Sequence, residues 1–206
     1  MTESSLGLLR RFCCFLVLLL LAGCAAMQPE DDAYTGALDP PPEVIVMPMT
    51  EADQALHKQA RQALAEAEFD QAEQYLNRMD GVHRHHPDVL ADRAMLARLR
   101  DDIGQAERLY REVLVIEPGH PVAANDLALI TRERGEVDES RALLQSALEK
   151  HPEEPRLHYN LAVLYELYLL ELPDALEHYR AYERLSGGTD DRVSNWIQDL
   201  ERRVEG

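Results

Sequence analysis

The sequence has few cysteines and far fewer basic than acidic side chains. Of its 206 residues three are cysteine, at positions 13, 14 and 24, so nothing after residue 24 can be a cysteine nucleophile, a thiolate metal ligand or a disulfide. Lysine and arginine number 21 against 38 aspartates and glutamates, which gives a formal net charge of −17. A chain this acidic is repelled by nucleic acid and by anionic headgroups, so we exclude a nucleic-acid-binding protein.

Local motifs of catalysis are also missing. The sequence has no glycine-rich phosphate loop, no nucleophile elbow and no local Ser/His/Asp set. Its many carboxylates fall at positions expected on the outer faces of helices. We therefore predict a protein that is not an enzyme, with no catalytic residue and no cofactor.

Residues 1–23 predict a secretory signal peptide. Arg10 and Arg11 precede an apolar run over 12–21, which is too short to span a membrane in the mature protein. The run ends in Leu21-Ala22-Gly23-Cys24, which resembles a bacterial lipobox. The resemblance implies that Cys24 becomes the first mature residue and carries acyl chains such as palmitate, a stable membrane anchor. An ordinary signal peptide, or an uncleaved anchor with a chance cysteine, is the alternative.

The residues that follow predict an anchored spacer. Ala25 stands where an aspartate would retain an enteric lipoprotein in the inner membrane, so we expect the outer membrane, with the protein facing the periplasm. The segment 24–52 is rich in proline and acidic residues and has no lysine or arginine, a composition typical of an extended tether. Alternatively, the apolar piece Val44–Met47 adds a strand or docks on a partner.

From residue 53 onward the sequence repeats itself every 34 residues. Alanine recurs at 60, 94, 128 and 162, and proline at 87, 121 and 155. A period of this length is that of one helix–turn–helix unit. The alanines suit close helix–helix contacts, and the prolines suit the first turn of a helix, where the missing N–H has no intrahelical partner. The units are 53–86, 87–120, 121–154 and 155–189, the last with one extra residue.

Residues 190–206 predict a capping helix. Its apolar stripe faces away from aspartates, glutamates and arginines, as the end of a repeat array requires, and consists of Val193, Trp196, Ile197, Leu200 and Val204.

The units closely resemble the tetratricopeptide repeat. The eighth position of each unit is one of the four alanines, and position 20 is small in Ala72, Ala106 and Ser140. In the fourth unit Ala175 and the aromatic Tyr179 arrive one residue late. The resemblance implies an all-α, right-handed solenoid of about four helix–turn–helix repeats plus a C-terminal capping helix.

In this family the first helix of each unit lines a concave groove that holds protein partners. Carried over position by position, the resemblance implies a groove formed by His57, Arg61, Leu64, Met95, Arg98, Leu99, Asn125, Leu129, Arg132, Tyr159, Val163 and Leu167. The apolar members predict a strip that binds an extended apolar peptide or an amphipathic helix. Arg98 and Arg132 either pair with acidic partner groups or are simply solvated. A further alternative is that the tether or the C-terminal helix fills the groove.

A histidine cluster at His83, His85 and His86 raises the alternative of zinc or copper binding. These residues, like His120 and His151, stand at expected helix ends, where a histidine satisfies terminal carbonyls. We therefore predict no metal site.

The leading hypothesis is a non-enzymatic, lipid-anchored scaffold that faces the periplasm and binds protein partners in a cell-envelope assembly. Alternatives are an accessory lipoprotein of a TonB-type energy-transducing system or of pilus or secretin assembly, a histidine-based metal-binding lipoprotein, and a structural protein that forms homo-oligomers through its own faces.

Overall fold

The computed structural model describes residues 46–79 and 81–205. The predicted signal peptide, Cys24 and most of the predicted tether lie outside these residues. Val46–Thr50 have no regular structure. The elements that follow are α2 (Glu51–Ala65), α3 (Phe69–Asn77), the 3-10 helix η1 (Gly81–His85), α4 (Pro87–Leu99), α5 (Ile103–Ile116), α6 (Pro121–Glu133), α7 (Val137–Lys150), α8 (Pro155–Leu164), the π-helical turn η2 (Tyr165–Leu169), α9 (Leu172–Ser186) and α10 (Asp191–Glu205).

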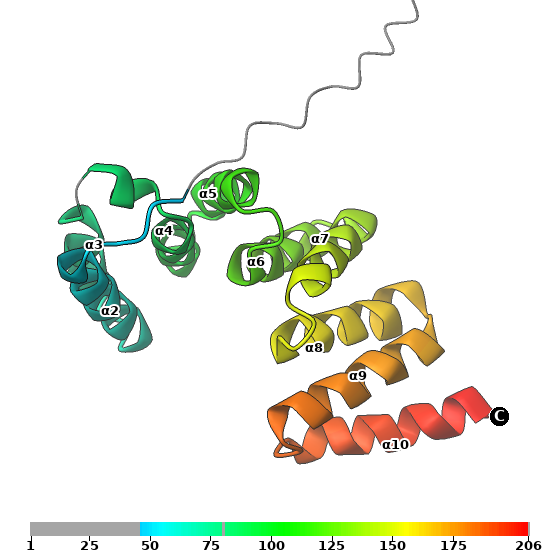
Figure 1. Cartoon of the computed structure of the whole chain (residues 1–206). Coiled ribbons are helices and arrows are strands. Elements are labelled where there is room, and N and C mark those ends of the chain that lie inside the picture. The colour runs from blue at the N-terminus through cyan, green and yellow to red at the C-terminus, as the bar shows by residue number, and fades with distance from the viewer. Residues whose placement is uncertain (1–45, 80, 206) are drawn as a thin grey trace, which may run out of the picture. The chain divides into compact units, whose positions relative to one another are not determined.

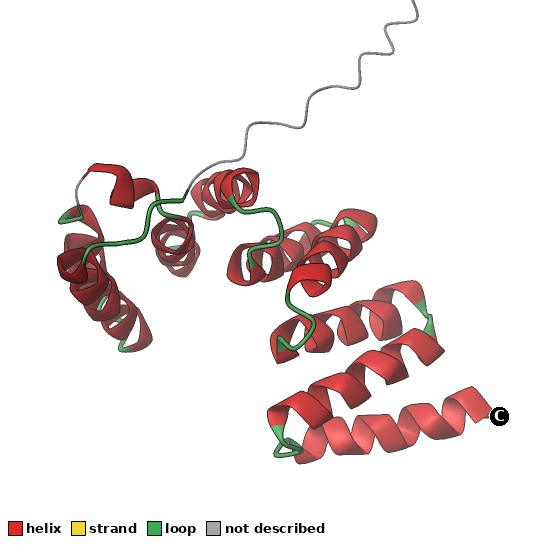
Figure 2. Ribbon diagram, in the orientation of Figure 1, coloured by secondary structure: helices red, strands yellow, loops and turns green. Residues whose placement is uncertain are grey.

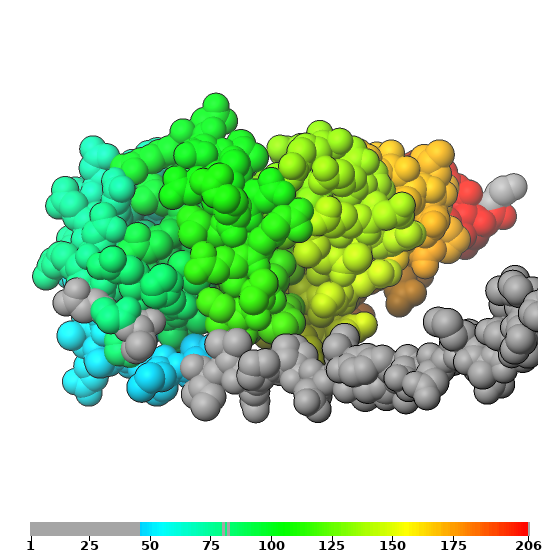
Figure 3. Space-filling model, turned by 90° about the horizontal axis from the view of Figure 1, so that it is seen from above, coloured from blue at the N-terminus to red at the C-terminus, as the bar shows by residue number. Residues whose placement is uncertain are grey.

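The regular secondary structure of the described residues is entirely helical, and the helices pack in consecutive pairs (Figure 1, Figure 2). The pairs are α2 with α3, α4 with α5, α6 with α7, and α8 with α9, and α10 packs on α9. Each pair also contacts the next one along the chain, so the repeats follow one another as successive bands (Figure 3). This arrangement confirms the predicted all-α solenoid. None of these helices has the length and apolar character needed to cross a bilayer.

The four alanines lie where the helices of a pair approach most closely. Ala60, Ala94 and Ala162 are fully buried, and Ala128 is 1% exposed. The backbone oxygen of Ala128 accepts a hydrogen bond from Ser140 Oγ in the second helix of the same pair, at 2.8 Å. A larger side chain at these positions would separate the two helices.

The prolines begin α4, α6 and α8, and the residue before each one caps the helix. His86 Nδ1 accepts from the Asp88 amide at 3.3 Å, and His120 Nδ1 accepts from the Ala123 amide at 3.3 Å. The expectation that these histidines satisfy the terminal carbonyls of the preceding helix is therefore wrong. Proline removes one of the free amides at the helix start, and a ring nitrogen satisfies another.

The extra residue of the fourth repeat is absorbed by η2. In this turn the Leu170 amide bonds to the Tyr165 carbonyl, five residues back, where an α-helix would use four. The wider turn shifts the following helix by one residue, so that Ala175 and Tyr179 take the buried positions, at 0% and 2% exposure. This is why both residues arrive one position late in the sequence.

The core consists of three hydrophobic clusters along the chain. One joins the first repeat to α4, one joins the second repeat to α6, and the largest runs from α6 to α10. In α10, Val193, Ile197 and Leu200 are buried, whereas Val204 in the last turn is 40% exposed. The ring of Trp196 lies 5.7 Å from that of Tyr179, and the side chain remains 38% exposed.

Candidate functional site

The first helices α2, α4, α6 and α8 form one continuous surface, which we call the first-helix face. Contacts of α2 with α4, of α4 with α6 and of α6 with α8 draw these helices together along one side of the stack. Side chains at equivalent positions of successive repeats are therefore neighbours on this face, although they stand about one repeat apart in the sequence.

A pocket of about 240 Å3 opens on the first-helix face and is lined by residues of α2, α4, α6 with its capping histidine, and α8. Four of the predicted groove residues line it, namely His57, Arg61, Leu64 and Met95. The other lining residues are Ala65, Asp88, Ala91, Asp92, His120, Val122 and Arg156.

Two histidine–aspartate pairs cross the repeat boundaries in this pocket. His57 Nε2 lies 2.7 Å from Asp92 Oδ2, and His120 Nε2 lies 3.1 Å from Asp88 Oδ1. Because Nδ1 of His120 accepts the helix-capping bond, Nε2 carries the proton and donates to Asp88. This hydrogen bond lowers the pKa of Asp88, and burial only partly counteracts it. Each pair fixes one repeat against the next.

Farther along the face, a buried network joins the second, third and fourth repeats. The Tyr110 hydroxyl donates to Asp126 at 2.8 Å, and Asn125 Nδ2 donates to the other carboxylate oxygen at 3.0 Å. Asn160 Nδ2 then donates to Asn125 Oδ1 at 2.6 Å. Burial, and then the Asp126 carboxylate, raise the pKa of Tyr110, so the phenol remains protonated. Arg98 approaches Asp126 at 3.8 Å.

Most side chains of the predicted apolar strip are buried or half-buried in contacts within the protein. The expectation that they are exposed for a partner is therefore corrected. Leu64 and Asn125 are buried, at 8% and 6% exposure. Tyr159 and Val163 pack against the C-terminal core, and the side chains of Met95 and Leu129 are half-buried. Because successive first helices are in contact, these side chains pack at the boundaries between repeats.

Of the predicted groove residues, Arg61, Leu99 and Leu167 are exposed, the two leucines at 43% and 63%. Arg98 and Arg132 are half-buried, with Nε atoms that lack a hydrogen-bond partner.

The sequence reasoning missed the carboxylates of this face by assigning acidic residues to outer surfaces. Asp92 and Asp126 are 7% and 6% exposed, and they stand 34 residues apart, in step with the alanines. An acidic residue that recurs on the period of the core alanines could have indicated a position facing the neighbouring repeat.

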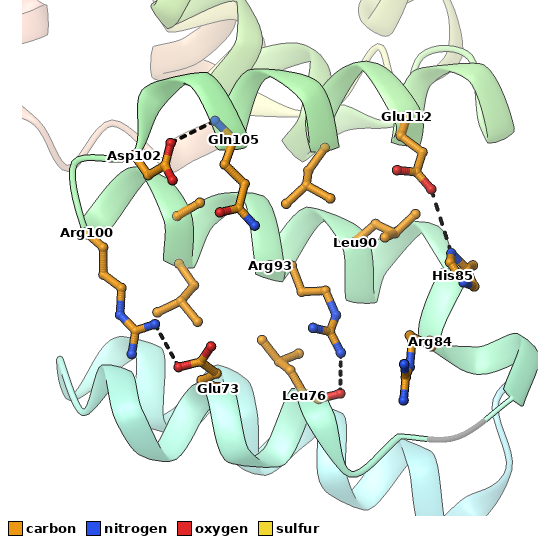
Figure 4. Close-up of a pocket in the computed structure, with 13 residues that line it drawn as sticks. Glu73, Leu76, Arg84, His85, Leu90, Arg93, Arg100, Asp102, Gln105 and Glu112 are labelled. Carbon is orange, nitrogen blue, oxygen red and sulfur yellow. Dashed lines mark hydrogen bonds and ion pairs between the residues drawn. The ribbon is translucent and has the colours of Figure 1, made fainter.

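A larger pocket, of about 560 Å3, lies among α3, η1, α4 and α5. Its polar side chains already bind one another, as Figure 4 shows. Arg93 donates to the Leu76 carbonyl at 2.6 Å, near the end of α3, and Arg100 pairs with Glu73 at 2.8 Å. These bonds hold the first repeat to the second, so we regard the pocket as a structural junction and not as the candidate site.

Each of the three clustered histidines contacts a different group of the protein. His83 Nδ1 lies 2.7 Å from Asp53, His85 Nδ1 lies 3.7 Å from Glu112, and His86 caps α4. Burial is the main cause that lowers the pKa of His86. Within the part of the chain that the structure describes, no three His, Cys, Asp or Glu side chains are grouped so as to hold a metal ion.

Comparison with family models matches residues 97–164, two 34-residue periods, to the tetratricopeptide repeat. The paired helices, the buried alanines and this match agree. The matched residues 97–164 are tetratricopeptide repeats. Comparison with curated protein sequences gave no match.

Solved structures share the fold. PilF of Pseudomonas aeruginosa superposes with a TM-score of 0.65 and 20% identity, over 75% of this chain and 70% of PilF. MamA from Desulfovibrio magneticus RS-1 gives 0.57 and 15% identity, over 77% of this chain and 88% of MamA. The Cut9 and Hcn1 assembly of the APC/C gives 0.60 and 15% identity, over 72% of this chain and 30% of that one. At these identities the likeness is one of fold alone.

Proposed function

We propose that this tetratricopeptide-repeat protein is a non-enzymatic scaffold that holds protein partners on its first-helix face. The observation that carries the proposal is the pocket on the first-helix face, which places the exposed Arg61 beside half-buried Met95 and two histidine–aspartate pairs. Such a surface offers a charged group and some apolar area on a rigid frame, which suits a peptide segment.

The proposed partner differs from the one that the sequence suggested. Because most of the predicted apolar positions are packed, we propose a segment with polar and acidic groups as well as apolar ones, rather than a purely apolar strip. Arg61 and Arg156 line the pocket and would meet the carboxylates of such a segment.

We further propose that the scaffold is anchored through a lipid on Cys24 and faces the periplasm, most simply from the outer membrane. The support is the sequence Leu21-Ala22-Gly23-Cys24 after an apolar run, followed by Ala25. Confinement to a membrane raises the effective concentration of a scaffold near its partners without new contacts. A Cys24→Ser variant should lose incorporation of radiolabelled palmitate. Labelling that persists in the variant would remove the anchor from the proposal.

Membership of a TonB-type, pilus or secretin system remains a narrower form of this proposal. The structure favours none of these systems, and it gives no observation in favour of metal binding by the three clustered histidines.

The test of the scaffold is site-specific photo-crosslinking in cells that produce the full chain. A photoreactive residue at Arg61 should capture a defined envelope protein, whereas one at Val115, an exposed residue of α5 at 75% exposure, should not. The protein captured at position 61 would then be purified and its binding measured directly. Equal capture from both positions, or capture of the chain's own tether alone, would contradict a partner site on the first-helix face.

A further inference from the structure

The turn that ends α8 exposes three large apolar side chains within four residues. Leu167 is 63% exposed, Tyr168 is 47% exposed and Leu170 is 73% exposed. The intervening Leu169 packs against the C-terminal core and fixes the turn in place. Scattered exposed leucines are ordinary, but three such side chains in one rigid turn form a small apolar surface.

The backbone conformation at position 170 is unfavourable for a leucine. Each helix pair turns through one residue in the left-handed region, and these residues are Ala67, Asp101, Gly135 and Leu170, with φ between 58° and 82°. The first three stand 34 residues apart, and η2 shifts the fourth by one. A bulky side chain is strained in this region, where glycine or asparagine is not. Neither the turn nor the core explains a leucine that is both strained and exposed.

The half-buried Arg132 contacts one of these side chains. The guanidinium carbon of Arg132 lies 5.7 Å from the centre of the Tyr168 ring. Among the described residues no carboxylate lies within ion-pair distance of Arg132, and its Nε has no hydrogen-bond partner. The carboxylates of the turn are engaged elsewhere, since Glu166 binds Tyr179 and Arg203, and Glu171 lies 3.9 Å from Arg141.

We propose that Leu167, Tyr168, Leu170 and Arg132 form a second docking surface, the repeat-four turn, for a partner segment that carries an acidic residue beside apolar ones. The apolar side chains of the segment would cover the two leucines and the tyrosine, and its carboxylate would pair with Arg132. The inference rests on the proposed scaffold function and extends it from the pocket on the first-helix face to the turn that ends α8. The negative charge of the chain disfavours an anionic lipid surface as the occupant.

The test is selection of a phage-displayed random dodecapeptide library on the purified full chain. Enriched peptides should combine Asp or Glu with Leu, Ile, Phe or Trp. Their affinity should fall about tenfold or more for Leu170→Gly, and about threefold to tenfold for Arg132→Gln. For a peptide in which the acidic residue is replaced by its amide, Arg132→Gln should no longer lower the affinity. Such a peptide has already lost its ion pair with Arg132.

Two matched variants separate docking from folding. Ala67→Gly changes another left-handed residue to glycine, and Val115→Ser removes another exposed apolar side chain; both should leave peptide affinity unchanged. Leu170→Gly relieves the backbone strain, so its melting temperature should stay the same or rise. A melting temperature that falls in this variant would show that Leu170 serves the fold and would overturn the proposal.

The remaining outcomes distinguish this inference from the proposed function. Peptides that lose affinity for Arg61→Gln but keep it for Leu170→Gly would support the pocket on the first-helix face and overturn the repeat-four turn. Concentration-dependent dimers that Leu170→Gly abolishes, or binding to phosphatidylcholine vesicles that it abolishes, would replace the proposed partner by a second copy or by a bilayer. Failure to enrich any peptide on the wild-type chain would overturn both proposals.

Discussion

At the scale of single residues, the repeat depends on side chains that are small. Ala128 is 1% exposed, and its carbonyl accepts hydrogen bonds from Thr131 and Ser140. A larger side chain there would push α6 from α7 and stretch both bonds. The same geometry recurs at Ala60, Ala94 and Ala162, so the period of the sequence is a period of close helix contacts.

Ala128→Leu should therefore lower the free energy of unfolding by about 1–3 kcal/mol through overpacking. Denaturant unfolding followed by far-UV circular dichroism measures it. Ala142→Leu, on the exposed side of α7, is the matched control and should change stability little. If the two variants unfold alike, the packing role assigned to Ala128 is wrong.

A second residue-scale feature is a pair of histidines between α8 and α9. His158 Nε2 donates to the Pro152 carbonyl at 2.9 Å, so its Nδ1 is free to accept from Nδ1–H of His178, also at 2.9 Å. His178 also stacks on the Tyr165 ring, with centroids 5.6 Å apart. This bond requires an unprotonated Nδ1 on His158, because a proton on that accepting nitrogen destroys the bond.

This pair predicts a loss of stability in weak acid. Burial first, and then the His158 charge, lower the pKa of His178 below its ordinary value of 6.5, against the opposing effect of Glu177 and Asp174. The stabilisation is therefore fully present above pH 6.5 and is lost as the pH falls toward the folded-state value. Melting temperatures of the wild type should drop from about pH 7.5 to about pH 5, and His178→Phe should show a shallower drop. Parallel curves for the two proteins would contradict this role for His178.

At the scale of elements, the ends of the helices show how the repeat tolerates variation. The π-helical turn η2 lets α8 and α9 accept one extra residue without moving Ala175 and Tyr179 out of the core. The capping helix α10 then covers the apolar side of α9 with three buried residues, Val193, Ile197 and Leu200. Without it the last repeat would expose this side to water.

Ile197→Asp should detach α10, because it places a charge at a side chain that is 7% exposed in the core. We expect a loss of at least about 2 kcal/mol. Trp196 is the only tryptophan of the chain and packs on Tyr179, so its fluorescence reports the cap directly and should shift to the red. Gln198→Asp, on the exposed side of the same helix, is the control. An unshifted spectrum in Ile197→Asp would mean that α10 does not depend on this contact.

At the scale of the whole solenoid, the described part of the chain is not uniform. The cluster that joins the first repeat to α4 is the smallest of the three, and the second helix of that repeat, α3, has nine residues where α5 and α7 have fourteen. The largest cluster runs from α6 to α10. Because each repeat of a solenoid contacts only its neighbours, such differences become differences in local stability.

Hydrogen exchange should therefore show that α2 and α3 open most readily and that α7 to α9 are the most protected. Unfolding followed by Trp196 fluorescence should require more denaturant than unfolding followed by total helix content. Uniform exchange across the repeats, with coincident transitions, would show that the array unfolds as one unit.

Much of the fold could be predicted from the sequence because its determinants are local and recur. The alanine and proline series gave the helix pairs, and the late arrival of Ala175 and Tyr179 marked the extra residue of the fourth repeat. Four residues that the family resemblance implied for the groove, His57, Arg61, Leu64 and Met95, line the pocket. The cap was predicted too, although Val204 in its stripe remains exposed.

The candidate site was predicted only in outline, because its contacts cross from one repeat to the next. The pairs His57 with Asp92, Asp88 with His120, and Asn125 with Asn160 join residues 32 to 35 positions apart. A helical pattern shows which side of a helix a residue occupies, but not how closely the next repeat approaches it. That spacing is set by packing, and it buries Leu64, Asn125, Asp92 and Asp126.

The sequence by itself thus determined a repeated helix pair with a capped end. Its repeats carry small residues at close helix contacts, prolines at helix N-termini and apolar stripes along the helices. Only the tertiary structure decided which side chains of the first-helix face pack between repeats and which stay exposed and available to bind a partner. The physical reason is that a side chain is free to bind only where no neighbouring helix already covers it, and the coverage depends on the whole stack.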